Sequence, residues 1–529
     1  MKTTWPRSAI PLLFLAVATS TIAAPRCVRT CRETYQTCRR GCAGLQGTDR
    51  HRCVVRCGDT SGCPPGGARI RTLAYVVTTC EEQHSQLTGK QELFVRRGDC
   101  DPVKVREYSY SRPVVDPFPL VDLCPLFGAL RWGNTSPIVG VFQRLGVPPD
   151  GSRVVFETAR NGSPVTPEPL PVPEDEQGIF SVSARADELP RRVGDVSREP
   201  SAFPGIPSVL TIPFFVFTPD GKTIVFPDRG PGPDGRDAVQ IASLDITNGT
   251  RRTLTRLPFA KPPSAFGGVV FPPQAQGGPS CVNAATDQAV SFFTTVSPDA
   301  DHPRATFFQI GLDGTGLRAL ELGGDAGERG FPAFQVIGHN RDLATFETDG
   351  TPKNRPSPIG GPLGAGNSPH PFELFIRLNH GSDFVQITHL GRSDTGQEGV
   401  TTDGRIIFHA SANDTGPDTC QLFSVGPFGG PIRQLTHFTP SGTDAYGCYY
   451  GPPSFGCVID LAEQDPVTKT IVFYSTCDPF GTNPNGGQLF AMRPDGSGLR
   501  QLTQARGVTG TSVQLPGPFA HAGGQSHCQ

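Results

Sequence analysis

The residues with the greatest chemical capacity in this chain are its sixteen cysteines, and the first six form three pairs with one spacing. The pairs are Cys27 with Cys31, Cys38 with Cys42, and Cys53 with Cys57, and Cys63 follows closely. A spacing of four residues places both thiols of a pair on one face of a helix. We therefore predict a short helical hairpin stapled by Cys42–Cys53 and Cys38–Cys57, because this stretch has too little apolar material for a core.

The same spacing also satisfies a structural zinc site, whose cysteine ligands are separated by two to four residues. Disulfides are the favoured interpretation, because all sixteen cysteines follow a predicted export signal and an oxidising compartment preserves disulfides. Cys80 and Cys100 bracket two strand-like runs, residues 71–79 and 91–97, and are predicted to close that hairpin. Three further pairings are predicted for later cysteines: Cys448 with Cys457, Cys420 with Cys477, and Cys281 with Cys528.

Acidic and imidazole side chains recur just past a β-branched strand, namely Glu157, Asp228, Glu347, His409 and Asp478. If these strands surround one axis, the side chains could converge on a cation such as calcium, which prefers oxygen ligands. The competing interpretation is that they are solvated groups on turns. We assign no catalytic residue and no cofactor, because no nucleophile elbow, zinc-protease motif, phosphate loop or dinucleotide fingerprint occurs.

The elements that would position these side chains come from a unit repeated six times between about residues 148 and 504. Each copy has a tight Asp-Gly turn, a β-branched strand ending in Phe, a second strand and a closing Leu-Thr. In the clearest copy, residues 219–226, Pro presets φ, Asp bonds its own backbone and Gly takes the left-handed conformation. The repeat predicts an all-β fold, a six-bladed β-propeller over residues 138–520, with tail strand 512–520 closing the ring against the first blade.

Two phrases carry a resemblance to a known family: TPDGKTIVF at residues 218–226 and RPDGSGLRQLT at residues 493–503. They resemble the propeller repeat of the TolB family and of related WD-repeat-like propellers, over roughly residues 138–520. The resemblance implies six blades, a bacterial envelope setting and protein partners. The N-terminal α/β domain of that family is replaced here by the cysteine-rich region, so the identity of any partner is not implied.

The ends and composition of the chain define three segments. Residues 1–24 have a basic start, an apolar core and small residues suited to cleavage, which predicts a signal peptide. Residues 25–125 form a basic, cysteine-rich head that ends in a Pro- and Val-rich linker, and residues 138–520 form the propeller. With a net charge of -2 and no apolar segment long enough to cross a bilayer, we expect a periplasmic or secreted monomer that does not bind nucleic acid.

Loop length supplies the functional prediction. The long segments are residues 228–237, 349–371, 411–419, 440–462 and 476–487, which fall in the connections after the second and fourth strands of a blade. In an up-and-down blade these connections share one face, and binding residues concentrate on loops held by a rigid scaffold. We predict a non-catalytic scaffold that binds a protein or ligand on this rim; the alternative is a metal-dependent hydrolase or lyase with its site at the channel mouth.

Overall fold

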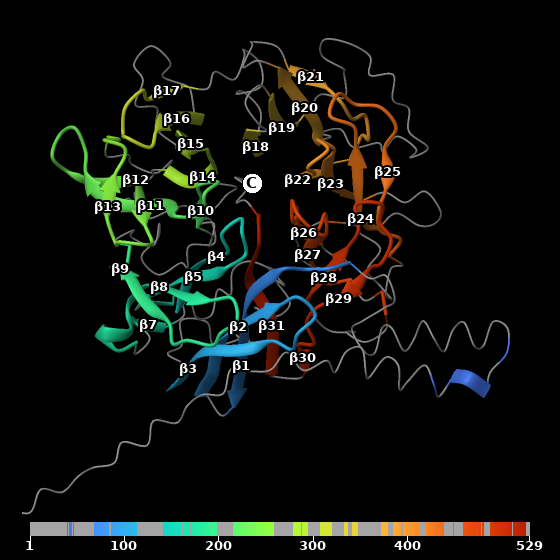
Figure 1. Ribbon diagram of the computed structural model, residues 1–529, viewed down its shortest axis with the longest axis horizontal. Coiled ribbons are helices and arrows are strands. Elements are labelled where there is room, and N and C mark those ends of the chain that lie inside the picture. The colour runs from blue at the N-terminus through green and yellow to red at the C-terminus, as the bar shows by residue number, and fades with distance from the viewer. Residues whose placement is uncertain are drawn as a thin grey trace, which may run out of the picture.

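The structure is a computed structural model, which describes residues 68–113 and 141–524 with gaps, together with residues 40, 42–44 and 46. The longest gaps are residues 198–214, 259–278, 320–332, 348–371 and 439–458, with Cys448 described inside the last. The described strands form six four-stranded antiparallel sheets, one five-stranded sheet and a small two-stranded ribbon. The larger sheets surround a central axis (Figure 1), so the chain is an all-β propeller.

The six four-stranded sheets are the six predicted blades, each built from four strands that we call a to d in chain order. The first three are β4 (Phe142–Gly146), β5 (Arg153–Thr158), β8 (Gly178–Ser183), β9 (Arg191–Gly194); β10 (Val216–Phe217), β11 (Thr223–Pro231), β12 (Asp237–Asp245), β13 (Arg251–Thr253); and β14 (Pro279–Ala285), β15 (Ala289–Thr294), β16 (Phe307–Gly311), β17 (Arg318–Ala319). The ribbon β6 (Gly162–Ser163) and β7 (Thr166–Pro169) interrupts the first blade.

The other three blades are β18 (Ala333–Val336), β19 (Arg341–Glu347), β20 (Phe372–Leu378), β21 (Phe384–Gln386); β22 (Gly396–Val400), β23 (Ile406–Ser411), β24 (Cys420–Val425), β25 (Arg433–Gln434); and β26 (Ile459–Gln464), β27 (Ile471–Ser475), β28 (Gln488–Met492), β29 (Arg500–Gln501). The helices with bounds in the described residues are two 3-10 turns, η1 (Cys42–Gly44) and η2 (Glu174–Glu176).

The Asp-Gly turns shape the chain locally and also fit one blade to the next. In the sixth blade Asp495 accepts a hydrogen bond from the Ser497 N–H at 2.9 Å, and Gly496 has a φ of +78°. A β-carbon on Gly496 would lie 2.4 Å from the Leu435 carbonyl oxygen of the fifth blade. Glycine is therefore required twice, by the left-handed backbone and by the close approach to the neighbouring blade.

The recurrent Leu-Thr closes a buried hydrogen-bond network between strands c and d. In the fifth blade Thr436 Oγ1 accepts from the Leu422 N–H at 2.9 Å and donates to Gln421 Oε1 at 2.7 Å. The Gln421 side chain also donates to the Phe438 carbonyl at 2.7 Å and accepts from the Phe438 N–H at 3.0 Å. The same bonds surround two other pairs: Gln240 with Thr255, and Gln488 with Thr503. Threonine recurs because buried polar groups need partners.

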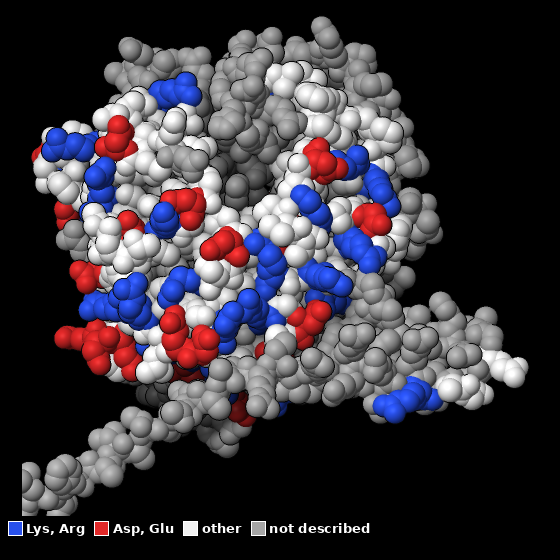
Figure 2. All heavy atoms as spheres, viewed as in Figure 1, with Lys and Arg blue, Asp and Glu red and all other residues white. Residues whose placement is uncertain are grey.

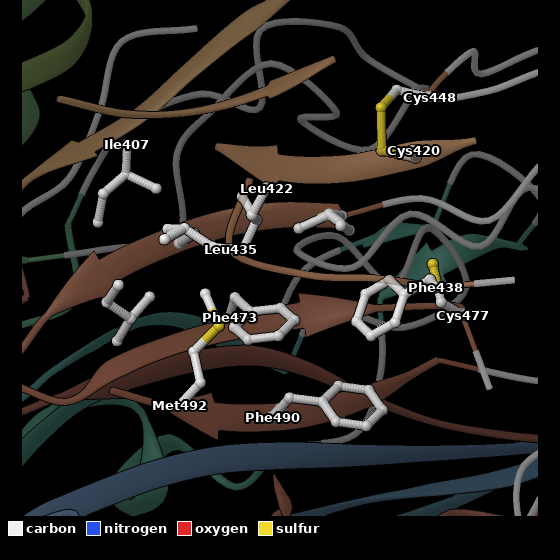
Figure 3. Packing of buried hydrophobic residues seen from close by; sticks show 13 residues of the cluster. Ile407, Cys420, Leu422, Leu435, Phe438, Cys448, Phe473, Cys477, Phe490 and Met492 are labelled. Atoms are coloured by element: carbon white, nitrogen blue, oxygen red, sulfur yellow. A yellow bond between two sulfur atoms is a disulfide. The ribbon is translucent and has the colours of Figure 1, made fainter. Parts of the chain in front are cut away.

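Aromatic stacking explains why strand b carries a Phe. The Phe of strand b stacks on a Phe of strand c, with ring centroids 5.4 Å apart for Phe408 and Phe423 and 5.6 Å for Phe473 and Phe490. Figure 3 shows the cluster between the fifth and sixth blades, where Phe473 and Phe490 pack with Met492 and Phe438. Packing between neighbouring blades therefore supplies the core.

The five-stranded sheet, which we call the closing sheet, joins the two ends of the chain. Its order is β3 (Val103–Pro113), β2 (Gln86–Arg97), β1 (Thr72–Gln83), β31 (Ser512–His521) and β30 (Gly507–Thr509). One side of β1 packs on the sixth blade through Leu73 and Tyr75, and the other side packs on the first blade through Ala74 and Val76. The closing sheet therefore occupies the place of a further blade between the sixth and the first.

The tail strand closes the ring against the first blade as predicted, but it does so within a sheet that the sequence did not anticipate. The tail strand β31 pairs with β1, from Leu73 opposite His521 to Glu81 opposite Ser512, and not with the sheet of the first blade. The reason is that residues 72–113, which the sequence placed in a separate head, fill the gap. The predicted helical hairpin of the head lies outside the described residues, apart from residues 40, 42–44 and 46.

The predicted Cys80–Cys100 bond is wrong, although both cysteines are in disulfides. Thr72 lies opposite Arg97 and Cys80 lies opposite Gly89, so Cys100 is at the open end of the hairpin. The eight residues from Thr72 to Cys80 span about 26 Å of strand, far beyond the reach of a disulfide. Two cysteines that flank a pair of antiparallel strands can bond only when both lie at the same end of the hairpin.

Candidate functional site

The connections between strands divide the propeller into two faces. Because consecutive strands in a blade are antiparallel, the a–b and c–d turns lie on one face and the b–c and d–a connections on the other. We call these the turn face and the long-loop face. In the structure the long connections after the second and fourth strands include residues 348–371, 435–458 and 476–487.

One predicted loop is shorter than the sequence suggested, and the bounds of another differ from the prediction. Strand β11 continues to Pro231 and β12 begins at Asp237, which leaves residues 232–236 as the connection. Strand β26 begins at Ile459, so the connection that was predicted to reach residue 462 ends at residue 458. Most of the remaining long connections lie outside the described residues, and the strand ends beneath them define the site.

A disulfide fixes one long connection to the end of a strand. Cys420, the first residue of β24, is bonded to Cys448 in the d–a connection of the fifth blade, with a Cα–Cα distance of 4.6 Å (Figure 3). The Cys448 N–H also donates to Ser411 Oγ at 2.7 Å. The connection 435–458 is therefore tied to the long-loop ends of both β23 and β24.

This bond corrects two predicted pairings. Because Cys420 is bonded to Cys448, neither Cys448–Cys457 nor Cys420–Cys477 forms, although Cys477 is in another disulfide. The sequence paired Cys448 with the next cysteine along the chain and Cys420 with a cysteine near the adjacent blade, whereas the bond joins the first residue of β24 to Cys448 in the d–a connection. The side chain of Cys281 and residue Cys528 lie outside the description, so that pairing stays a prediction. Disulfides indicate an oxidising compartment.

A histidine–carboxylate pair joins β22 and β23, with its histidine two residues before Ser411. His409 Nδ1 bonds to Glu398 Oε1, and the Glu398 side chain is fully buried while that of His409 is 12% exposed. Glu398 Oε2 accepts a hydrogen bond from the Ala462 N–H of the sixth blade at 2.8 Å. A carboxylate held at both oxygens fixes the orientation of the imidazole, which suits a proton donor or a polar contact to a ligand.

Two glycines make room for this pair. A β-carbon on Gly396 would lie 2.4 Å from His409 Cε1, and one on Gly399 would lie 2.7 Å from the Ala462 carbonyl oxygen. The register of β22 shifts between Gln397 and Gly399, so Glu398 is the extra residue of a β-bulge. Sequence reasoning missed Glu398, but two glycines flanking an acidic residue in a strand are a usable signal of close backbone approach.

Two of the predicted channel-mouth residues, Glu157 and Asp228, are each paired with an arginine. Glu157 accepts from Arg144 at 2.7 Å and from the Ser197 N–H at 2.5 Å, and Asp228 is paired with Arg251 at 2.5 Å. Both carboxylates are buried against arginines rather than converging on a shared point.

His409 lies beside Glu398, whereas the side chain of Glu347 and residue Asp478 fall outside the description. In the described part of the chain no group of three or more His, Cys, Asp or Glu side chains could hold a metal ion. The channel-mouth metal site accordingly stays a prediction.

The turn face carries a groove of about 530 Å³ between the fifth and sixth blades. It lies between strand d of the fifth blade and the c–d turn of the sixth, and Arg433 crosses it to donate to the Asp495 carbonyl at 2.9 Å. Its lining is Ile432, Arg433, Gln434, Leu435, His437, Asp495, Gly496 and Ser497.

Across the described residues, no helix is long and apolar enough to span a membrane.

Comparison with known proteins shows distant structural similarity. No protein-family profile matches the sequence, and no curated protein matches it. An oligogalacturonate lyase in complex with manganese is 11% identical, with a TM-score of 0.40 over 81% of this chain and 97% of that one.

TolB from Acinetobacter baumannii is 14% identical, with a TM-score of 0.32 over 90% of this chain and 86% of that one. Prolyl oligopeptidase B from Galerina marginata is 12% identical, with a TM-score of 0.37 over 81% of this chain and 51% of that one. These proteins differ in activity, so the similarity concerns the β-propeller and assigns no activity to this chain.

Proposed function

We propose that this protein is a non-catalytic, exported scaffold that binds a protein partner on its long-loop face. The observation that supports this most directly is the disulfide Cys420–Cys448, which ties the connection 435–458 to the strand ends beneath it. A loop that is fixed in place loses less conformational entropy on binding than a free one, which favours recognition. The chain would act outside the cytoplasm, where that disulfide persists.

The test is affinity capture of the tagged, oxidised protein from its own cell-envelope extract, followed by titration with the captured partner. The variant Cys420→Ser/Cys448→Ser releases the connection, and Lys222→Glu on the exposed turn face serves as the control. We expect at least a tenfold loss of affinity in the disulfide variant and none in the control. Circular dichroism and melting of both variants establish that the blades remain folded.

Two outcomes would contradict this function: capture of nothing at a near-equal amount, or equal affinity of the disulfide variant and the wild type. A partner whose binding is weakened by Lys222→Glu alone would place recognition on the opposite face.

A second candidate, a metal-dependent propeller enzyme, is favoured by the oriented His409–Glu398 pair. Carboxylate–histidine pairs are common around catalytic metals, because the carboxylate fixes the tautomer of the ligand. Stoichiometric metal in the purified wild type, lost in His409→Gln and retained in Lys222→Glu, would favour this candidate over the scaffold. Metal content is measured by elemental analysis, independently of any substrate.

A further inference from the structure

One buried carboxylate of the fourth blade occupies the place that a glutamine has in three other blades. Glu373, the second residue of strand c, is 2% exposed, and its Oε2 accepts a hydrogen bond from Thr388 Oγ1 at 2.6 Å. Thr388 Oγ1 in turn accepts from the Leu374 N–H at 2.8 Å. Thr436 makes the same bonds in the fifth blade, where the side chain that it donates to is Gln421. Glu373 therefore belongs to the same kind of c–d network, with a titratable group in place of an amide.

The two kinds of side chain hold the following connection differently. Gln421 Nε2 donates to the Phe438 carbonyl at 2.7 Å, and Gln421 Oε1 accepts from the Phe438 N–H at 3.0 Å. Glu373 has no N–H to donate, and its Oε1 instead accepts from the Gly391 N–H at 2.7 Å. The Leu390 N–H also donates to this carboxylate. Both oxygens thus act as acceptors, which is the pattern of an ionised carboxylate.

A glycine accompanies the carboxylate in the fourth blade. Gly391 has a φ of +62°, which lies in the left-handed region that favours glycine. The matching positions, three residues after the network threonine, are Pro258, Thr439 and Arg506 in the blades that have a glutamine. The fourth blade therefore combines a carboxylate with a residue whose backbone can change conformation without a side-chain clash.

Glu373 differs from the acidic side chains on the surface. Figure 2 shows those side chains lying among Lys and Arg. In the described part of the chain, the hydrogen bonds to Glu373 come from neutral groups of Thr388, Leu390 and Gly391. Burial outweighs these bonds and raises the pKa of Glu373 above its usual value. A buried carboxylate that is hydrogen-bonded to no cation takes up a proton more readily than a paired one.

Other ionisable groups lie on the elements around Glu373. Those with described side chains are Arg377 on β20, His389 and Arg392 on the connection, and Glu398 on β22. The ionisable side chains of β19, and Asp394, lie outside the described residues. Burial lowers the pKa of His389, so this imidazole also takes up its proton only in acid. A response to acid must therefore be separated between Glu373 and His389.

We propose that Glu373 is a proton-operated switch for residues 387–392, the first residues of the fourth blade's d–a connection on the long-loop face. In the ionised state Glu373 holds the Gly391 N–H, as observed. A proton taken up from solvent on Oε1 converts this acceptor into an O–H donor. Glu373 then bonds a backbone carbonyl of the connection, as Gln421 bonds that of Phe438, and releases Gly391. The two states thus correspond to two hydrogen-bond patterns that this molecule already contains.

The switch would act on the face that carries the long connections. The Phe372 N–H donates to the Arg392 carbonyl at 2.8 Å, directly after the b–c connection that ends at residue 371. Leu390 packs in the core shared by the fourth and fifth blades. Release of Gly391 would loosen residues between these two contacts, and acid would weaken binding of a partner there. That last consequence rests on the scaffold proposal, whereas the switch itself does not.

The experiment is hydrogen exchange of the full, oxidised protein at about pH 7.5 and about pH 4.5, on either side of the range in which a carboxyl with a raised pKa titrates. Mass spectrometry gives protection factors, which remove the intrinsic pH dependence of exchange. We expect the protection of residues 387–392 to fall roughly tenfold or more at the lower pH, because a hydrogen bond to a charged group is lost. Residues 502–506, which follow Gln488, are the internal control and should change little.

Two variants assign the response to one side chain. Glu373→Gln introduces the side chain that three other blades use, so this variant should fold. We expect it to show the weaker protection of residues 387–392 at both pH values. His389→Gln removes the imidazole of the connection and should retain the response of the wild type.

Three results would overturn the proposal. The first is equal protection of residues 387–392 at both pH values in the wild type. The second is an equal fall in residues 502–506, which would indicate general loosening in acid. The third is a response that Glu373→Gln retains and His389→Gln abolishes, which would assign it to the imidazole. None of them bears on the scaffold proposal, because no partner is present in the measurement.

Discussion

The closing sheet meets its two neighbours in different ways. Against the first blade the contacts are mainly apolar or hydrogen bonds between neutral groups: Phe156 lies in the shared core, and Thr72 Oγ1 donates to the Gly151 carbonyl at 2.6 Å. The one cation described at this contact, Arg106, lies over an aromatic ring, 4.5 Å from the Phe180 centroid, rather than in an ion pair. Gln91 Oε1 accepts from the Val141 N–H at 3.0 Å. We call this contact the neutral seam.

Against the sixth blade an apolar core is combined with ion pairs, and we call this contact the ionic seam. Arg71 makes a two-pronged bond to Asp465, with Nε 2.9 Å from Oδ2 and Nη2 2.8 Å from Oδ1. The Asp465 side chain is 3% exposed. Arg500 bonds Asp99 along the same seam at 2.8 Å.

The two seams differ because the closing sheet joins strands from opposite ends of the chain. In the six blades an a–b turn joins neighbouring strands covalently, and in the first, second and fifth blades a Gly with a positive φ lies in that turn. In the closing sheet the adjacent strands β31 and β1 come from opposite ends of the chain, and no turn connects them. The Arg71–Asp465 pair holds this loose end against the a–b turn of the sixth blade. In the closing sheet this ion pair thus holds a strand in place, as a covalent a–b turn does in the six blades.

The largest effect is expected from the core of the neutral seam. Phe156 packs between Phe142 and Phe180, with centroid distances of 6.0 and 5.7 Å, and is fully buried. Phe156→Ala should lower the free energy of unfolding by about 3–5 kcal/mol, because it leaves a cavity that the blades cannot fill. Urea denaturation followed by fluorescence measures it. A loss below that of Arg71→Ala would reverse our ranking of the two seams.

Next in size is the loss of the ion pair. Arg71→Ala leaves the buried Asp465 carboxylate without its guanidinium, and we expect a loss of about 2–3 kcal/mol, reduced from the fully buried case because Arg71 is partly exposed. A double-mutant cycle with Asp465→Ala measures the coupling between the two side chains. Additive single losses would show that the pair does not hold the chain end.

A smaller loss is expected from the neutral hydrogen bond. Thr72→Val keeps the shape of the side chain and removes its bond to Gly151, which should cost about 1 kcal/mol. The same denaturation series measures it. The control is Thr88→Val, whose hydroxyl makes a 3.4 Å bond near the hairpin tip. A loss of the size found for Arg71→Ala would erase the distinction between the seams.

The smallest effect is the pH dependence of the ionic seam. Burial raises the pKa of Asp465, but hydrogen bonds from Arg71 and from the Val467 N–H outweigh it and hold the pKa below its usual range. A depressed carboxyl pKa contributes stability above the unfolded value of about 3.9, and that stability is lost as the pH falls through the folded value. Denaturation midpoints of the wild type should therefore fall below about pH 4 more steeply than those of Asp465→Asn. Parallel curves would contradict this assignment.

The six blades could be predicted because their signals are local. The turn chemistry of Asp495-Gly496 and the Phe in each second strand act within a few residues, and the structure confirms the blades they predict. The Leu-Thr phrase was found as a pattern. Its cause, the network of Thr436 with Gln421, became visible only once strand c was placed beside strand d.

The candidate site could be predicted only in part. His409 was selected by its position after a strand, but Glu398 comes from a bulge in the preceding strand, and the flanking glycines Gly396 and Gly399 were not used as its signal. Glu157 was selected for the same reason as His409, and its pairing with Arg144 gives it a different role. Position in the repeat identified which side chains to consider, and the residues of the neighbouring strand decided which hydrogen bonds and ion pairs those side chains make.

The sequence by itself determined the blades, their turns and the face on which the long connections lie, since these follow from periodicity and turn chemistry within one unit. The tertiary structure alone decided that β1 and β31 share the closing sheet, that Cys420 bonds Cys448, and that Arg71 faces Asp465. These contacts join residues between 28 and several hundred positions apart. Their formation depends on distances in the folded chain, which no local preference encodes.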